Sequence, residues 1–498
     1  MFIGIDCGTQ STKAIVWNSH TKKIIGTGAA KYPVLMYRPG CQEQKADWWI
    51  DALIKAVREA ISAANINPKV VKAIGVSGQQ HGLVALDPHD QVIRDVKLWC
   101  DTEGTQALEK FESKQVYPLH KELGIHVPVA FTIAKLLWLK QTEPHEFARI
   151  RKVLLPHEYI NFWFTGNYRA EAGDASGTGY FNTHTRRWSQ SVLYQLNFHH
   201  DFVLPELIQS HEPYGVIRPE IADLFGFNRQ VIISSGGGDN MMAAIGTGNT
   251  SENKLTISLG TSGTAYSHTF NQIDTEKYPD INAFCSSTNG YLPLISTMNV
   301  TSATEKFRAL FQIDLATFEG AISSAPIGSA GIRVLPYLNG ARLPNQPHAK
   351  ASIHGLSMMN MSRENILRAL VEGITYNLVS GIRLFRKNGM RFQSATLVGG
   401  GANSPCWRQM MADITGLEIR VPQETEAAAL GAALQAQWCY LCSSGQYYGI
   451  QDLCDDSIRF NPERHTVSVP AHQQVYRQLF QEYMYLVNNH FGNHELSK

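Results

Sequence analysis

The beginning of the chain alternates short hydrophobic runs with tight turns. Residues 2–6, 13–17 and 23–29 are rich in residues that favour strands, and a Gly/Thr/Ser turn separates the first run from the second. Three such runs joined by turns predict an antiparallel meander. We therefore expect the chain to open with a sheet rather than with a helix.

The hydrophobic period then changes from that of a strand to that of a helix. After Asp47, which is placed to cap a helix, hydrophobic positions recur every three or four residues, at Trp49, Leu53, Val57, Ala60 and Ala64. A buried strand at 70–76 follows and leads into the segment SGQQHG. Strands followed by alternating helices and strands predict an α/β fold built in layers.

A similar pattern restarts near residue 254. Residues 254–259 predict a strand, GTSGT predicts a turn, and a second strand is expected from Ala265 onward. The turn CGTQST at 7–12 aligns with LGTSGT at 259–264. Two copies of one strand-turn-strand unit in separate halves imply two related domains that face each other.

Regular elements continue to alternate in the second half. In chain order we predict a helix at about 362–388 closed by Gly389, a strand at 395–398, a helix from Ser404, a strand at 417–421 and an Ala-rich helix from Glu426. The boundary between the halves falls near 246–249, which predicts domains at 1–246 and 247–498.

Composition narrows the class of protein. Of 498 residues 44% are hydrophobic, and 44 Lys and Arg nearly cancel 43 Asp and Glu. We expect a globular chain without a basic field for nucleic acid and without a run near the ~20 apolar residues of a membrane span. The start MFIGIDCGTQ lacks a signal region, and eight sparse cysteines indicate reduced thiols, so a cytoplasmic location is predicted. Cys439 and Cys442 are interpreted as two thiols packed along a helix.

Several common nucleotide and hydrolase motifs do not occur in the sequence, among them the Walker, Rossmann, zincin and nucleophile-elbow patterns. What remains are the turns DCGTQSTK and SLGTSGT, whose small residues let backbone N–H groups and hydroxyls approach an anion closely. Asp6 ends the first strand and could hold Mg²⁺, whereas Ser258 at the equivalent place carries no charge. One such hairpin alone is common in proteins, but the duplicated pair favours a polyphosphate between two domains.

The segment SSGGGDN at 234–240 follows a hydrophobic strand and precedes the helix-like MMAAIG. Three glycines leave the carboxylate of Asp239 accessible at a helix start, where the helix dipole favours its ionised form. Such a carboxylate could accept a proton from a substrate. The alternative is that Asp239 only caps the helix.

Two further segments could contact a ligand. The run LVGGGANS at 397–404 ends a strand and opens a helix, so its glycines could admit a flat base or a sugar, or could simply form a tight connection. In SGQQHG, Gln80 and His81 leave a strand end and could hydrogen-bond several hydroxyl groups. A structural histidine is the alternative at that position.

Taken in this order, the segments resemble the FGGY carbohydrate kinases of the actin-like ATPase superfamily. The resemblance spans essentially the whole chain, and within the family it is greatest to members that act on xylulose. The blocks that carry it are IGIDCGTQSTK, EQKADWW, SGQQHG, LWCD, FTIAKLLWL, LLPHEY, GDASGT, GGGDN, SLGTSG, LPYLNGAR and GGGANSPCWRQMMADITG. It implies two ribonuclease-H-like domains with ATP and a sugar in the cleft between them.

Carried over position by position, the resemblance implies a role for each candidate residue. Asp239 becomes the general base, and Asp6 and Asp239 become the magnesium ligands. The implied sugar-binding residues are Gln80, His81, Trp99, Asp101, Asp239 and Asn240. The implied phosphate and adenosine contacts are Gly8, Thr9, Gln10, Ser11, Lys13, Gly260, Thr261, Ser262, Gly400, Gly401, Ala402 and Asn403.

The implied activity is Mg²⁺-dependent phosphorylation of a ketopentose by ATP, D-xylulose foremost, within xylose metabolism and by a protein that could form a homodimer. Two departures leave the sugar open. Glu103 stands where many relatives carry a base in W-x-D-x-R, and Ala341 stands where relatives often carry Glu. Ribulose, fuculose and gluconate therefore stay as alternative substrates.

A rival from another class is an actin-like ATPase that uses ATP for conformational work, as a chaperone or filament protein does. Such an ATPase needs no pocket for a polyol. The pair Asp239-Asn240, together with Gln80-His81, favours the kinase over this rival.

Overall fold

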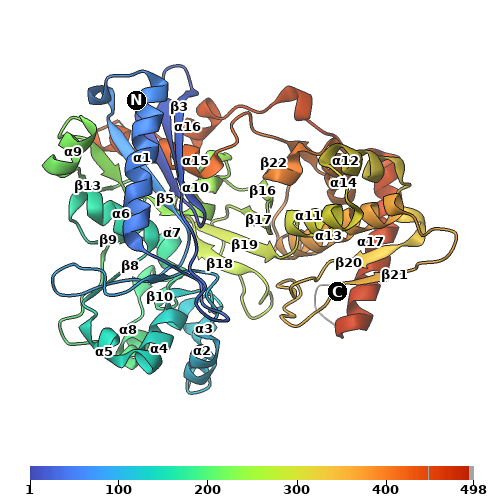
Figure 1. The fold of residues 1–498 in the computed structure, drawn as a ribbon, viewed down its shortest axis with the longest axis horizontal. Coiled ribbons are helices and arrows are strands. Elements are labelled where there is room, and N and C mark those ends of the chain that lie inside the picture. The colour runs from blue at the N-terminus through green and yellow to red at the C-terminus, as the bar shows by residue number, and fades with distance from the viewer. Residues whose placement is uncertain (447, 493–498) are drawn as a thin grey trace.

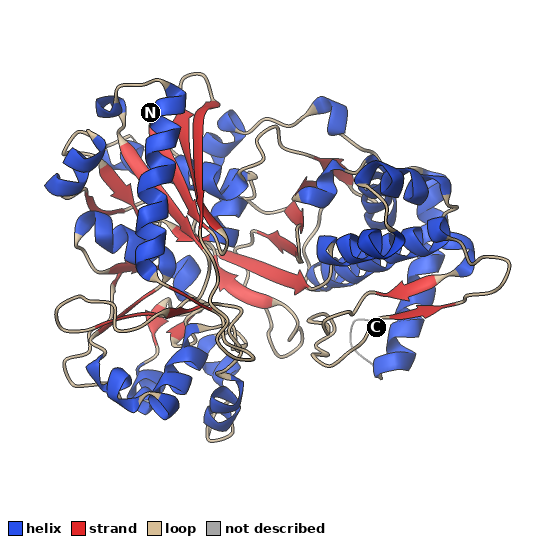
Figure 2. Cartoon of the chain, viewed as in Figure 1, coloured by secondary structure: helices blue, strands red, loops and turns tan. Residues whose placement is uncertain are grey.

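The computed structural model describes residues 1–446 and 448–492, which form two lobes with a mixed β-sheet in each (Figure 1). Helices pack around both sheets (Figure 2). Strands β18 (Asn282–Cys285) and β19 (Tyr291–Thr297) extend from the second lobe toward the first (Figure 1). The α/β fold predicted from the sequence is confirmed.

The first sheet has the strand order β13-β14-β5-β1-β2-β3, with β15 also paired to β5. Its strands are β1 (Phe2–Cys7), β2 (Ser11–Asn18), β3 (Lys23–Lys31), β5 (Ala73–Gly78), β13 (Pro213–Val216), β14 (Ile232–Ser234) and β15 (Gly237–Gly238). β1 pairs antiparallel with β2 and parallel with β5, and β2 pairs antiparallel with β3. The predicted meander is therefore confirmed.

The second sheet has the order β18-β19-β17-β16-β22-β23. Its remaining strands are β16 (Lys254–Leu259), β17 (Gly263–Ser267), β22 (Ser394–Val398) and β23 (Glu418–Arg420). β16 pairs antiparallel with β17 and parallel with β22, as β1 does with β2 and β5. The two turns predicted as copies thus occupy equivalent positions in two sheets of related topology.

Helix α1 (Ala46–Ala64) packs against β2 and β3 through close backbone contacts. A Cβ atom at Gly26 would lie 2.2 Å from the carbonyl oxygen of Ala60, so a side chain there would force the helix away. The predicted cap was wrong, because Lys45 occupies the N-cap and Asp47 lies within the first turn. There its charge still favours the helix through the dipole.

The C-terminal Ala-rich helix α15 (Ala427–Ser443) lies on the first lobe (Figure 1). A Cβ atom at Gly4 of β1 would lie 1.9 Å from the carbonyl oxygen of Ala429, and one at Gly431 would lie 1.7 Å from that of Met242 in α10 (Asp239–Gly246). Small residues on both sides therefore bring α15 against the sheet and α10. The division at 246 stays a prediction, and residues 493–498 of the second predicted domain lie outside the described residues.

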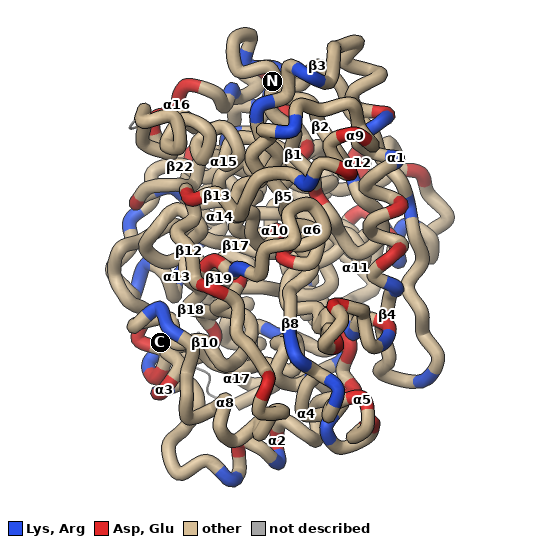
Figure 3. The backbone as a smooth tube through the Cα atoms, turned by 90° about the vertical axis from the view of Figure 1, so that its left-hand side faces the viewer, with Lys and Arg blue, Asp and Glu red and all other residues tan. Residues whose placement is uncertain are grey.

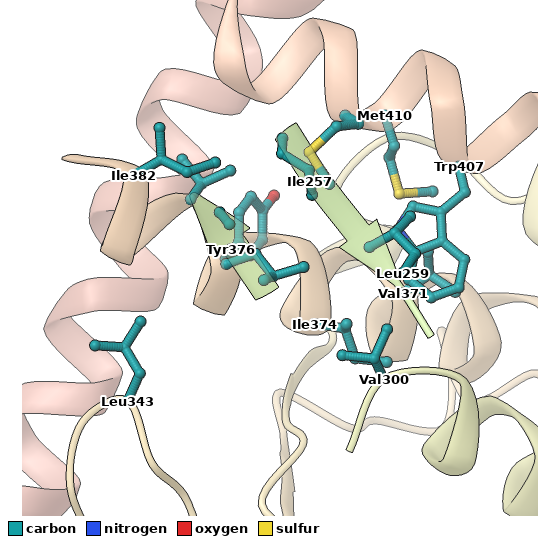
Figure 4. Packing of buried hydrophobic residues seen from close by; sticks show 14 of the residues in the cluster. Ile257, Leu259, Val300, Leu343, Val371, Ile374, Tyr376, Ile382, Trp407 and Met410 are labelled. Carbon is teal, nitrogen blue, oxygen red and sulfur yellow. The ribbon is translucent and has the colours of Figure 1, made fainter. Parts of the chain in front are cut away.

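The core of the second lobe surrounds helix α13 (Arg363–Lys387). Figure 4 shows Val371, Ile374 and Tyr376 of this helix near strand residues Ile257 and Leu259. Trp407 and Met410 of α14 (Pro405–Thr415) complete the cluster, and Trp407 Nε1 donates to Thr375 Oγ1 at 3.0 Å. Ser362 caps α13 and Gly389 follows its end with a φ of 92°, close to the predicted limits.

The other elements surround these two sheets. In the first half they are β4 (Glu43–Gln44), β6 (Val84–Leu86), β7 (Val96–Lys97), α2 (Thr105–Glu112), α3 (Leu119–Leu123), α4 (Thr132–Thr142), α5 (Pro144–Arg149), β8 (Lys152–Leu154), α6 (Pro156–Thr165), β9 (Arg169–Glu171), α7 (Ala172–Ala175), β10 (Phe181–Asn182), β11 (Arg187–Trp188), α8 (Gln190–Leu196), β12 (Glu206–Ile208) and α9 (Pro219–Phe225). In the second half they are α11 (Thr301–Phe311), α12 (Leu315–Ser324), β20 (Arg333–Leu335), β21 (Ser352–His354), α16 (Ile450–Ser457) and α17 (Pro470–Phe491).

Charge and hydropathy agree with the expectations from composition. In the view of Figure 3, Lys and Arg alternate with Asp and Glu and neither sign dominates. Within 1–446 and 448–492, no helix is long and apolar enough to cross a bilayer. All eight cysteines lie in this part of the chain as free thiols, and Cys439 and Cys442 both lie on α15, which confirms their interpretation as helix-packed residues.

Candidate active site

Three parallel strands of the first sheet end at the same place. Asp6 near the end of β1 lies opposite Ser77 of β5, and Gly78 of β5 lies opposite Gly238 of β15. Gln80 follows β5 and Asp239 follows β15 directly. The carboxyl ends of these strands therefore bring Asp6, Gln80 and Asp239 to one edge of the sheet, where open α/β sheets usually bind ligands.

Asp239 is the first residue of α10, and Gly238 occupies the N-cap. The alternative that Asp239 caps the helix is therefore wrong. Burial, followed by the negative charges of Asp6 and Asp174, raises the pKa of Asp239 to about 7. The sequence predicted that the helix dipole would favour the ionised form of this carboxyl, but burial and the neighbouring charges have the larger effect on its pKa. A carboxylate with a pKa near neutrality is suited to accept and release a proton.

Ser77 Oγ donates a hydrogen bond to Asp6 Oδ1 at 2.8 Å. Burial raises the pKa of Asp6 to about 6, against the opposing effects of Ser77 and Lys13. Two crowded carboxylates are a donor set that suits a hard divalent cation, because such a cation would relieve their repulsion. Asp6 and Asp239 are therefore chemically suited to hold Mg²⁺.

The first turn is a compact structure tied to its surroundings. Gly8 N donates to the carbonyl oxygen of Ser11 at 3.0 Å and closes the turn. Thr9 Oγ1 accepts from Trp99 Nε1 at 3.1 Å. Lys13 Nζ lies 2.7 Å from Glu426 Oε2, at the start of α15, and Gln10 is exposed. The turn thus leaves Gln10 accessible and fixes Thr9 through Trp99.

The second turn adjoins the glycine-rich segment that follows β22. A Cβ atom at Gly399 would lie 2.6 Å from the carbonyl carbon of Leu259 and 3.0 Å from Gly260 N. This close approach, with a φ of 87°, requires glycine at 399. Gly400, in contrast, borders open space. The two segments predicted to contact phosphate and adenosine are therefore neighbours.

The remaining residues of these two segments differ in exposure. Thr261 and Ser262 are exposed, whereas Gly401 and Ala402 are buried. Residues 400–403 form a 3₁₀ turn, and Asn403 Oδ1 accepts from Arg464 Nη1 at 2.8 Å. An adenine or ribose could therefore approach at Gly400 and Asn403 more readily than at the buried pair.

His81 has a strained backbone and an enclosed ring. Its φ is 69°, a left-handed conformation that is uncommon outside glycine. The imidazole packs against Phe131 and stacks on Phe284 of β18, with ring centroids 4.9 and 5.6 Å away. Burial lowers the pKa of His81 to about 4, so the ring is neutral near pH 7. Gly177 is required beside it, because a Cβ atom there would lie 1.8 Å from Cε1 of the ring.

Asp101 and Glu103 belong to a buried charge cluster. Asp101 accepts from Lys97 Nζ at 3.0 Å and from the backbone N–H groups of Gln42 and Glu103. Glu103 pairs with Lys97 at 2.5 Å and with Arg38. A direct contact between Asp101 and a sugar would therefore compete with three internal partners. The acid at 103 is neutralised by Arg38, a base from another segment.

Cys41, Glu43, Asp101 and Glu103 offer ligand atoms within 4.8 Å of one another, as a metal site would. The ammonium group of Lys97 lies among them, 3.1 Å from Glu43 and 3.0 Å from Asp101. Arg38 also pairs with Glu103, and Arg94 with Glu43 at 2.8 Å, so three cations offset the three carboxylates of the cluster. Trp99, which is close in sequence, lies 5.6 Å from the Arg342 guanidinium, a contact between the two halves of the chain.

The sequence did not single out Asp174 and His157, which lie directly behind the candidate sugar residues. His157 Nδ1 lies 2.8 Å from Asp174 Oδ2, and Asp174 Oδ1 accepts from Gln80 Nε2 at 3.3 Å. Both residues are fully buried. The only signal in the sequence was a pair of ionisable residues within the blocks LLPHEY and GDASGT.

Comparison with known families identifies the class of protein. The model of the FGGY family of carbohydrate kinases, N-terminal domain, matches residues 1–246, and that of the C-terminal domain matches 255–440. The fold is the two-domain α/β fold of these kinases, which is that of the actin-like ATPases. The chain belongs to the FGGY family of carbohydrate kinases.

Individual relatives cover nearly the whole chain. A xylulose kinase of Haemophilus influenzae is 45% identical over 496 residues, which is 97% of this chain and 99% of that protein. A xylulose kinase of Bacillus subtilis is 33% identical over 97% and 95% of the two chains. The crystal structure of a xyloylose kinase from Brucella ovis has a TM-score of 0.90 at 28% identity and covers 98% of each chain.

The fold alone does not distinguish between sugars. The crystal structure of a gluconate kinase from Lactobacillus acidophilus also has a TM-score of 0.90, at 24% identity over 99% of this chain and 98% of that one. Substrate preference must therefore come from particular side chains in the site.

Proposed function

We propose that this enzyme transfers the γ-phosphoryl group of ATP to the terminal hydroxyl of D-xylulose and forms D-xylulose 5-phosphate. Nearly full-length identity of 45% to a xylulose kinase supports the choice of sugar. The observation that carries the chemistry is the carboxylate of Asp239, with a pKa of about 7, at the strand ends that also bring Asp6 and Gln80 together. Xylose metabolism in the cytoplasm is the proposed setting.

Asp239 is the proposed general base. Its Oδ1 accepts two hydrogen bonds from Asn240, which leaves Oδ2 as the oxygen available to a substrate. Oδ2 would take the proton of the terminal hydroxyl as the sugar oxygen bonds to the γ-phosphorus and the bond to the β-phosphate oxygen breaks. ADP then leaves with that electron pair. Positioning and electrostatic stabilisation are expected to supply most of the rate in such transfers.

The two turns are the proposed phosphate-binding elements. Their N–H and hydroxyl groups belong to Gly8, Thr9, Gln10, Ser11, Gly260, Thr261 and Ser262, with Lys13 as a nearby cation. Asp6 and Asp239 would hold Mg²⁺, which neutralises charge on the polyphosphate when bound. The segment from Gly400 through Gly401 and Ala402 to Asn403 would border the adenosine, with Gly400 giving the closest backbone approach.

Sugar binding is proposed for Gln80, His81, Trp99 and Asn240. A neutral imidazole can donate from one ring nitrogen and accept at the other, which suits a hydroxyl group. For Asp101 we propose an indirect part, since its bonds to Lys97, Gln42 and Glu103 hold the segment that carries Trp99.

A coupled assay of ADP release across D-xylulose, D-ribulose, L-fuculose and D-gluconate tests the proposal. We expect D-xylulose to give the highest kcat/KM and a product phosphorylated at its terminal carbon. A higher kcat/KM with another compound would reassign the substrate within the family. ATP hydrolysis that no sugar stimulates would favour a conformational ATPase. Sedimentation velocity on the same protein tests the homodimer that we propose alongside.

A further inference from the structure

A buried, hydrogen-bonded pair, Asp174 and His157, lies behind the proposed sugar site. Asp174 belongs to the short helix α7, and Glu171 holds the start of that helix by accepting from Gly173 N and Asp174 N at 2.9 and 2.7 Å. Asp174 Oδ2 is bonded to His157 Nδ1 at 2.8 Å. Burial opposes a charge on the ring, but the hydrogen bond from this ring to Asp174 still raises the pKa of His157.

From this pair a series of side-chain hydrogen bonds leads to the proposed base. Gln80 Nε2 donates to Asp174 Oδ1 at 3.3 Å. Gln80 Oε1 accepts from Asn240 Nδ2 at 2.8 Å, and the same amide group donates to Asp239 Oδ1 at 2.9 Å. His157, Asp174, Gln80, Asn240 and Asp239 are thus connected in that order.

Asp174 and Asp239 lie at the two ends of this series, and both carboxylates accept the bonds that reach them. An ionised carboxylate only accepts, so Gln80 must turn its NH₂ group toward Asp174 and its carbonyl oxygen toward Asn240. Asn240 must then use its NH₂ group on Gln80 and Asp239, which leaves its own carbonyl oxygen for another donor. Without a charged neighbour, the two orientations of an amide are much closer in energy.

We propose that Asp174, held by His157, is a positioning residue that sets which hydrogen-bonding groups Gln80 and Asn240 present to the sugar and that orients Asp239. The proposal rests on the proposed function. His81 also lies beside Asp174. Its Nδ1 is 3.8 Å from Asp174 Oδ1 and has no hydrogen-bond partner among the described residues. Asp174 therefore adjoins both members of the Gln80-His81 pair without being a catalytic residue.

The charge-removing variant Asp174→Asn tests this role. Asn keeps the size of the side chain but can donate as well as accept, so position 174 no longer requires the NH₂ group of Gln80 to face it, and only Asn240 still favours the present orientation. We expect kcat/KM for the sugar to fall by about 10- to 100-fold, the usual effect of mispairing buried hydrogen-bonding groups, and the KM for ATP to stay within about twofold.

Asp413→Asn is the matched control. Asp413 is a buried aspartate of α14 whose Oδ2 lies 2.9 Å from His472 Nδ1, and its hydrogen-bond partners Gln409, Val469 and His472 are not among the proposed site residues. Its substitution should lower the melting temperature without changing the ratio of the two KM values. An effect of Asp174→Asn on kcat/KM no larger than that of Asp413→Asn, or an equal rise in both KM values, would overturn the proposal.

A second pair of variants decides the matter if Asp174→Asn does not fold. His157→Asn keeps an N–H donor near the position of Nδ1, whereas His157→Leu removes it. We expect the Asn variant to retain at least about tenfold more kcat/KM for the sugar than the Leu variant. Equal values for the two would overturn the role of the pair.

The test of Asp174 does not depend on which sugar is the natural substrate. All comparisons use whichever sugar the parent phosphorylates best. Preference for a compound other than D-xylulose therefore corrects the substrate alone, while the absence of any sugar phosphorylation contradicts both proposals.

Discussion

Asn240 donates two hydrogen bonds to the same oxygen of Asp239, one from its backbone N–H at 2.7 Å and one from its side-chain amide at 2.9 Å. These bonds lower the pKa of Asp239, yet burial and the charges of Asp6 and Asp174 raise it by more. Asp239 is therefore held in a fixed orientation while its ionised form is disfavoured. That combination has consequences for stability as well as for activity.

The first prediction concerns the stability of the free protein. An unfolded aspartate titrates near pH ~3.9, whereas the pKa of folded Asp239 is about 7. The folded state binds more protons between these values, so the contribution of Asp239 to the free energy of unfolding is lost as the pH rises through this window. Asp239→Asn should therefore melt at a higher temperature than the parent at about pH 8, without Mg²⁺ or nucleotide.

The pH dependence of that difference is the control for the first prediction. Toward pH 4 the parent carboxyl is protonated, and the difference between the melting temperatures of the two proteins should shrink. A difference that is constant with pH, or an Asn variant that is less stable at about pH 8, would contradict the predicted crowding of charge.

The second prediction concerns the metal. Asp6→Asn should raise the Mg²⁺ concentration for half-maximal turnover far more than it raises the KM for the sugar, because it removes one of two carboxylates suited to the cation. Ser258→Ala is the matched control, since Ser258 in β16 occupies the position equivalent to Asp6 in β1. Identical Mg²⁺ titrations for Asp6→Asn and the parent would refute the assignment.

The third prediction concerns sugar recognition by His81. We expect His81→Asn to raise the KM for the sugar by about 10- to 100-fold, because a shorter side chain loses a buried hydrogen bond worth ~1–3 kcal/mol. Asn tolerates the left-handed backbone at this position, so the effect reports on the imidazole. The KM for ATP should be unchanged, and an equal loss of ATP and sugar affinity would instead indicate a structural histidine.

The fourth prediction uses the glycine beside that ring. A Cβ atom at Gly177 would lie 1.8 Å from the imidazole, so Gly177→Ala should displace His81 and raise the sugar KM in the same direction. Outside its chain neighbours and the backbone of its own helix, no atom of the described residues lies within 4 Å of the corresponding position at Gly320 in α12, so Gly320→Ala should leave kinetics unchanged and stabilise the helix. Parent-like sugar kinetics in Gly177→Ala would show that His81 is not needed in its present orientation.

Local sequence signals predicted the sheets well. The turn copies at 7–12 and 259–264 were visible because each needs small residues within a few positions, and β16 has the predicted limits, 254–259. The caps were less predictable. The N-cap position is defined by backbone dihedral angles, and the type of side chain only favours it. Lys45 therefore occupies the N-cap of α1 in place of Asp47, and Gly238 occupies that of α10 in place of Asp239.

Long-range partners could not be predicted from one sequence. Asp174 contacts Gln80 across 94 positions, and Arg38 neutralises Glu103 across 65. Glu103 therefore looked like an unpaired acid beside the sugar, although the fold supplies two cations to it. Such pairs arise only when distant segments meet.

The most direct test of the account is the turnover of D-xylulose by Asp239→Asn at saturating sugar, ATP and Mg²⁺, with binding of both substrates measured by calorimetry. Because a general base typically contributes ~10²–10⁴-fold, kcat should fall by that factor while both affinities and the fold are retained. Gly238 is the N-cap, and Asn keeps a side-chain oxygen that can accept from Asn240 N as Asp239 does, so a change at the helix start does not account for such a fall. Turnover within a few-fold of the parent, with both substrates bound, would contradict the assignment of Asp239 as the base.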